Sequence, residues 1–128
     1  MRKNEFILYG LSKHKEIIDK IIQELNVFHD SFDIRLILTE ALTNAYKHGN
    51  NSREDKPIFL RYILKGENVK FEIKDSGSGF KNITIQENAA DGDLLNDSGR
   101  GLFLISCVAD EIEMRNNVLI IQKQINFK

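Results

Sequence analysis

The chain has 128 residues, of which 41% are hydrophobic, and its formal net charge at pH 7 is −1. That length fits one domain better than two, so we expect residues 1–128 to form a single domain with its own hydrophobic core. Lysines and arginines are dispersed and no apolar run is long enough to cross a bilayer, so we expect neither a nucleic-acid nor a membrane partner.

Hydrophobic periodicity predicts strands and helices in a mixed order along the chain. Isoleucines at helical spacing follow Ser12, a candidate N-cap, and a second helix would start at Asp30 or Ser31. Residues 49–52, Gly-Asn-Asn-Ser, tolerate the left-handed conformation and end that second helix. In chain order the predicted elements are a strand at residues 5–9, helices at 13–27 and 31–48, strands at 57–64 and 69–74, a helix at 101–109, and strands at 111–115 and 118–127.

The segment between the third and fourth of these strands is different in composition. Residues 75–99 are rich in Gly, Ser, Asn and Asp, and a connection that long in a compact domain is usually functional or disordered. The element order predicts an α+β fold: a two-layer α/β sandwich with helices on one face of a mixed, mostly antiparallel sheet. Cys107 is the only cysteine, which excludes an internal disulfide and favours a reducing, cytoplasmic location.

The first candidate site segment lies on the second predicted helix and runs Glu40-Ala-Leu-Thr-Asn-Ala-Tyr-Lys-His-Gly49. An amide oxygen such as that of Asn44 suits Mg²⁺, a carboxylate can accept a proton from a hydroxyl, and a lysine can contact a phosphate. A solvated helix face would show the same pattern, so both interpretations stay open for this segment alone. Four polar residues lie three or four positions apart, on one helix face: Glu40, Asn44, Lys47 and His48.

The second candidate segment, Asp75-Ser-Gly-Ser-Gly-Phe80, directly follows a predicted strand. Gly77 and Gly79 would let the backbone approach a ligand without a Cβ in the way. Asp75 at the strand end can accept a hydrogen bond from an exocyclic amine. Taken alone, these residue types are typical of a simple turn that ends the strand, which is the alternative.

The third candidate segment, Ser98-Gly-Arg-Gly-Leu102, opens the last predicted helix. Glycines there expose backbone N–H groups, and the helix dipole adds positive potential, which together favour an anion. A helix start that only needs flexible residues is the alternative. The segment is not a Walker A loop, because no Gly-Lys-Ser/Thr follows.

In this order, the three segments resemble the nucleotide-binding boxes of the GHKL ATPase superfamily. Glu40-x-x-x-Asn44 resembles the N box, and the glycine boxes are matched by Asp75-x-Gly77-x-Gly79 and Gly99-x-Gly101-Leu102. Within the superfamily, the Glu-Ala-x-x-Asn-Ala-x-x-His-Gly pattern is similar to anti-sigma-factor serine/threonine kinases, as is the later Asp110-Glu-Ile112. Three boxes in the right order are a far more specific signature than one.

The resemblance implies a Bergerat-type fold with ATP and Mg²⁺ as cofactors. Asn44 would hold Mg²⁺, Glu40 would be the catalytic base, and Asp75 would bind the adenine amino group. Residues from about 81 to 98 would form a lid over the nucleotide. The implied nucleotide-binding residues are Asn44, Lys47, His48, Asp75, Gly77, Gly79, Gly99, Arg100, Gly101 and Leu102.

The implied activity is phosphorylation of an antagonist protein by a kinase that also sequesters a sigma factor, and such proteins often form homodimers. Two alternatives stay open: a nucleotide-gated interaction module without catalysis, and a detached histidine-kinase ATP-binding domain. Two departures from the family pattern bear on ATP use. Asn117-Val118 stands where relatives often carry Gly-Thr, and Lys81-Asn82 follows Phe80 in place of an Asp-Pro type.

Overall fold

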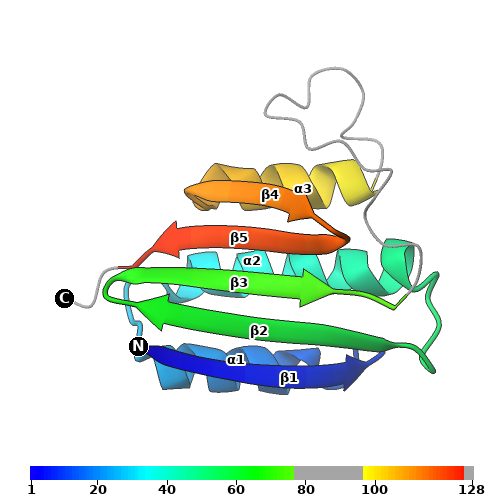
Figure 1. Cartoon of the computed structure of the whole chain (residues 1–128), viewed down its shortest axis with the longest axis horizontal. Coiled ribbons are helices and arrows are strands. Elements are labelled where there is room, and N and C mark those ends of the chain that lie inside the picture. The colour runs from blue at the N-terminus through cyan, green and yellow to red at the C-terminus, as the bar shows by residue number, and fades with distance from the viewer. Residues whose placement is uncertain (77–96, 126–128) are drawn as a thin grey trace.

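The computed structural model describes residues 1–76 and 97–125 as two layers, a sheet with helices on one face (Figure 1). This confirms the predicted α+β sandwich. The elements are β1 (Arg2–Tyr9), α1 (His14–Leu25), α2 (Ser31–Asn44), a π-helical turn η1 (Ala45–Gly49), β2 (Pro57–Lys65), β3 (Asn68–Lys74), α3 (Asp97–Val108), β4 (Glu111–Arg115) and β5 (Val118–Gln124).

The sheet has strand order β1-β2-β3-β5-β4, and every pairing between the described strands is antiparallel. The expectation of a mixed sheet is therefore corrected. The reason lies in the two helices between β1 and β2, which return the chain to the end where β1 stops. The register then pairs Tyr9 with Pro57, so β2 runs back alongside β1.

The core lies between the helices and one face of the sheet. Alternate residues of β3 point into it, as the two-residue period of a strand requires: Val69, Phe71 and Ile73 are fully buried. Helix α2 packs between α1 and α3 and is the most deeply buried helix (Figure 1). Each Leu or Ile buried there stabilises the fold by roughly 1.5–3 kcal/mol. The buried residues of α2 are Ile34, Ile37, Leu38, Ala41, Leu42 and Asn44.

The helix ends differ from the sequence prediction. Helix α1 starts at His14 with Lys13 as its N-cap, so Ser12 is not the capping residue. Asp30 is the N-cap of α2, as predicted, but its side chain makes no capping hydrogen bond. Regular α-helix stops at Asn44 rather than near His48, because the chain widens into the π-helical turn.

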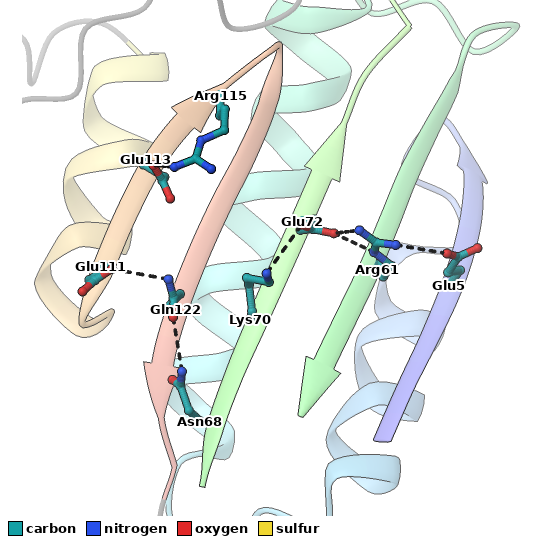
Figure 2. Close-up of polar contacts among 9 residues, drawn as sticks. All are labelled: Glu5, Arg61, Asn68, Lys70, Glu72, Glu111, Glu113, Arg115 and Gln122. Atoms are coloured by element: carbon teal, nitrogen blue, oxygen red, sulfur yellow. Dashed lines mark hydrogen bonds and ion pairs between the residues drawn. The ribbon is translucent and has the colours of Figure 1, made fainter. Parts of the chain in front are cut away.

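The opposite face of the sheet is polar and solvated over much of its width. Figure 2 shows contacts that run across the strands, including Arg61 Nε to Glu72 Oε1 at 2.6 Å and Arg61 Nη1 to Glu5 Oε1 at 3.7 Å. Exposed ion pairs of this kind contribute about 0–1 kcal/mol each. No helix within the described residues is long and apolar enough to cross a membrane.

Lys123 is a polar residue of β5 that faces the helices and is only 9% exposed. Its Nζ donates to the Val108 carbonyl oxygen at 3.0 Å and lies 3.5 Å from Oδ2 of Asp33. Val108 ends α3 and Asp33 is in the first turn of α2. This contact fixes the end of α3 against the start of α2.

A second polar contact holds α1 against the sheet. The hydroxyl of Tyr62, which is 1% exposed, donates to Oε1 of Glu24 at 2.6 Å, and Asn4 Nδ2 donates to the same oxygen at 3.1 Å. The Tyr62 hydrogen bond lowers the pKa of Glu24, while burial raises the pKa of Tyr62. Glu24 is thus held as a carboxylate beside a protonated phenol.

Tyr62→Phe is expected to lower the free energy of unfolding at pH 7 by about 1 kcal/mol, because Oε1 of the half-buried Glu24 loses the shorter of its two hydrogen bonds. The folded-state pKa of Glu24 is lowered, so its contribution is complete above the unfolded-chain pKa of about 4.3 and is lost as pH falls further. The difference between wild type and variant should therefore shrink below about pH 4. Urea unfolding across pH measures it, with the exposed Tyr9→Phe as control; a gap that is equal at all pH values contradicts the account.

Candidate functional site

Two of the three candidate segments meet where α2 ends and α3 begins. A Cβ built on Gly101 would lie 3.0 Å from Nδ2 of Asn44 and 3.0 Å from Oε2 of Glu40. That spacing is tighter than most real Cβ contacts. The backbone at the start of α3 therefore rests directly on the amide and the carboxylate of the N-box segment.

The remaining segment joins them through Asp75, which follows β3 and is 4% exposed. A Cβ on Gly49 would lie 2.2 Å from Oδ2 of Asp75, closer than a real Cβ approaches any such atom. The backbone at the end of the π-helical turn therefore lies against the Asp75 carboxylate. Glu40, Asn44, Asp75 and Gly101 are thus gathered around the C-terminal end of one helix.

The π-helical turn decides where the later residues of the N-box segment lie. Its defining bond runs from Asn50 N–H to the Ala45 carbonyl at 2.9 Å, one residue wider than an α-helical turn. Lys47 is exposed and His48 is half-buried, whereas Asn44 is buried. The regular α-helical spacing behind the predicted single polar face therefore extends only to Glu40 and Asn44, because Lys47 and His48 lie in the wider turn. Turns of this kind are frequent at functional sites.

The N-box segment contains polar atoms that are buried but unsatisfied. Among the described residues, Nδ2 of Asn44 and Nε2 of His48 are buried without a hydrogen-bond partner. Buried polar atoms are nearly always paired, and each one left unpaired costs about 1–3 kcal/mol. A bound ligand that hydrogen-bonds to these atoms would remove the cost. The unpaired atoms therefore indicate a binding site.

Mg²⁺ requires oxygen ligands, which the side chains of this corner can supply in part. No group of three or more His, Cys, Asp or Glu side chains within residues 1–76 and 97–125 could hold a metal ion. Mg²⁺, however, usually keeps several waters and binds one or two protein oxygens together with substrate phosphates. Asn44, with the Glu40 carboxylate beside it, fits that mode, because a half-turn of the Asn44 carboxamide presents its oxygen at the position of its nitrogen.

The second candidate segment is only partly placed. Gly77 and Gly79 lie outside the described residues, as does most of the predicted lid, so their roles stay predictions. Residues 97 and 98 belong to α3, which corrects the predicted lid boundary near residue 98. Helix α3 accordingly starts before the predicted position 101 and includes Gly99 in its first turn.

The other two residues expected in the third segment have opposite surroundings. Arg100 is exposed on α3, so its proposed contact with a phosphate stays a prediction. Leu102 is 1% exposed and belongs to the hydrophobic core. Its burial is accounted for by packing, and it anchors the helix start that carries Gly101.

Asn50 is a residue of this corner to which the sequence analysis gave no role beyond ending a helix. It is 0% exposed, and its side chain contacts the backbone of β2 and of Ser76. The segment Gly-Asn-Asn-Ser has the composition of a loop, so no sequence signal separates the buried Asn50 from the exposed Asn51.

Gly49→Ala is expected to lower the free energy of unfolding by about 1–3 kcal/mol, because the new Cβ would overlap the Asp75 carboxylate. Gly101→Ala should cost less, because its Cβ would meet the nearest atoms at 3.0 Å rather than 2.2 Å and smaller shifts would relieve the contact. Urea denaturation of both variants measures the order. Equal stability of Gly49→Ala and wild type would show that the close approach is absent.

Comparison with known proteins identifies the family. The family model described as histidine kinase-like ATPase domain matches residues 13–123. The chain is 26% identical over 88 residues to serine-protein kinase RsbW of Listeria monocytogenes serotype 4a, covering 64% of this chain and 56% of that protein. It is 27% identical over 99 residues to serine-protein kinase RsbW of Bacillus pumilus, covering 71% and 61%.

A third relative is the anti-sigma F factor of Bacillus thuringiensis, which is 28% identical over 102 residues. The match covers 78% of this chain and 66% of that protein. The chain therefore spans little more than half the length of the Listeria protein and more of the others. The family model, by contrast, covers most of this chain and includes Glu40, Asn44, Asp75 and Gly101. On this match, the chain belongs to the histidine kinase-like ATPase domain family, as its resemblance to GHKL ATPases implied.

Proposed function

We propose that this protein binds Mg-ATP at the corner formed by the end of α2, Asp75 and the start of α3, and phosphorylates a serine or threonine on an antagonist protein. The observation that carries the proposal is the contact of Gly101 with Glu40 and Asn44, beside a buried Asn44 amide nitrogen that has no partner in the described structure. The printed names of the relatives, serine-protein kinase and anti-sigma F factor, support it.

Each residue would have a separate task. Asn44 would hold Mg²⁺, which when bound offsets negative charge on the phosphates. The N–H groups in the first turn of α3, which includes Gly99, would bind phosphate oxygens with help from the helix dipole, and Gly101 would keep the space beside Glu40 and Asn44 open. Lys47, exposed one turn after Asn44, and the exposed Arg100 would add positive charge at the rim of the site.

Glu40 would orient and deprotonate the attacking hydroxyl. Its Oε2 is held next to the Gly101 backbone, so it faces the point where α3 would present the phosphates. Phosphoryl transfer depends mainly on positioning and charge neutralisation, so one fixed carboxylate is sufficient for the base role. In the same proposal, a sigma factor would be the sequestered partner, and the protein would act in the cytoplasm.

One observation favours a second candidate, a nucleotide-gated interaction module without phosphoryl transfer. Val118 pairs with Lys74 in the sheet, directly before Asp75, and it takes the place of the threonine in the Gly-Thr pair of the family pattern. A valine offers no hydroxyl, so the base contact there is altered. Incubation with labelled ATP and a candidate antagonist separates the possibilities: label on serine or threonine supports the kinase, ATP-dependent binding without label supports the module, and label on histidine supports a detached histidine-kinase domain.

Asn44→Ala is expected to weaken Mg-ATP binding by at least about tenfold, equivalent to about 1.4 kcal/mol, because a metal ligand is lost. Isothermal titration calorimetry with ATP, in Mg²⁺ and in EDTA, measures the change. Thr43→Ala, a neighbouring half-buried position on the same helix, is the control and should bind normally. Tight, Mg²⁺-dependent binding by Asn44→Ala would remove Asn44 as the metal ligand.

Glu40→Gln is expected to bind ATP within about twofold of wild type but to transfer phosphate at least about 100-fold more slowly, because the amide cannot accept the proton. Glutamine keeps the side-chain volume against Gly101. Single-turnover transfer to the antagonist measures the rate, and calorimetry measures the binding. Full transfer by this variant would exclude Glu40 as the base.

A further inference from the structure

A fully buried carboxamide, that of Asn50, connects three segments next to the nucleotide corner. Its Nδ2 donates to the Lys56 carbonyl oxygen at 3.0 Å and to the Pro57 carbonyl oxygen at 3.3 Å. Its Oδ1 accepts from the Ser76 backbone N–H at 2.8 Å. Asn50 is 0% exposed, and its backbone N–H closes the π-helical turn.

The sheet itself stops just before the residues that Asn50 holds. In the described pairings, Lys74 is the last residue of β3 with partners, Phe59 on one side and Val118 on the other. Asp75 and Ser76 lie directly beyond these pairings. Asn50 therefore supplies a fixed backbone contact directly after Asp75, and Ser76 Oγ adds a second by donating to the Pro57 carbonyl oxygen at 2.6 Å.

The same residue also sets the other side of Asp75. Asn50 follows Gly49, whose backbone lies against the Asp75 carboxylate. Asn50 thus links two segments that flank the Asp75 side chain. Gly49, directly before Asn50, lies against the Asp75 carboxylate, and Ser76, directly after Asp75, donates to the Asn50 side chain. A shift of either segment moves the carboxylate oxygens, and hydrogen bonds weaken steeply once the donor–acceptor distance or angle leaves a narrow range.

We propose that Asn50 is a positioning residue for base recognition: it fixes the Asp75 carboxylate at the point where it accepts a hydrogen bond from the exocyclic amine of adenine, and so sets the preference for adenine nucleotides. This inference rests on the proposed nucleotide site. Asn50 itself touches no ligand; it acts through Asp75. The side chain is suited to the task because an amide provides donors and an acceptor at once, which neither Asp nor Leu of similar size does.

The readout is the ratio of the dissociation constants for ITP and ATP, because inosine carries an oxygen where adenine has its amine. Asn50→Ala should lower this ratio by about tenfold while the ITP constant changes by less than about threefold. A purely structural role would weaken binding of both nucleotides equally and leave the ratio unchanged. The adjacent exposed Asn51→Gly keeps the positive φ of 53° accessible and is the matched control.

Two further variants keep the test decisive. In an Asp75→Asn background, Asn50→Ala should have no additional effect on the ratio, because the group it positions has been removed. If Asn50→Ala does not fold, Ser76→Ala is used in its place. It removes the hydrogen bond from Ser76 Oγ to the Pro57 carbonyl oxygen at an exposed position and should lower the ratio by about threefold.

An unchanged ratio in the folded Asn50→Ala variant, or in Ser76→Ala where that variant replaces it, overturns the inference. Equal binding of ATP and ITP by the wild-type protein would also overturn it, because Asp75 would then make no hydrogen bond that distinguishes the adenine amine. Both outcomes leave ATP binding itself intact. A wild-type protein that binds neither nucleotide contradicts the proposed function instead, so the two failures are distinguishable.

Discussion

The close approach of backbone to side chain at two glycines is the constraint on which the site depends. At Gly101 the start of α3 meets Glu40 and Asn44, and at Gly49 the end of the π-helical turn meets Asp75. A side chain at either position would push one segment away from the others. Because both contacts involve the same helix end, they bring residues from positions 40 to 101 into one corner, which the core of α2 then holds in place.

The corner is polar where the rest of the helix layer is apolar, and this contrast is expected of a functional site. Asn44, Asn50 and Asp75 are all less than 5% exposed, beside a core otherwise composed almost entirely of aliphatic and aromatic side chains. Buried polar groups destabilise a fold unless they are paired. The Asn50 side chain is hydrogen-bonded through both its nitrogen and its oxygen and holds the backbone of the corner in place. The Asn44 amide nitrogen has no hydrogen-bond partner among the described residues and is available to a ligand.

The strands and the first part of the site could be predicted from the sequence. Alternating residues placed β2 and β3 within a few residues of their bounds, and the regular spacing of Glu40 and Asn44 was sufficient because α2 is α-helical up to Asn44. The α-helical spacing does not extend to Lys47 and His48, because they lie in a π-helical turn, which the sequence pattern did not indicate. Periodicity also carries no information about strand direction, so the fully antiparallel sheet was not foreseen, and the buried Asn50 was indistinguishable from a loop residue.

The most direct test of the nucleotide corner is backbone-amide NMR of the full chain titrated with Mg-ADP. The account predicts that shifts concentrate at residues 44–50, 75–76 and 99–102, with the solvated face of the sheet, including Arg61 and Gln122, unchanged. Shifts confined to that sheet face, or none at millimolar nucleotide, would contradict it.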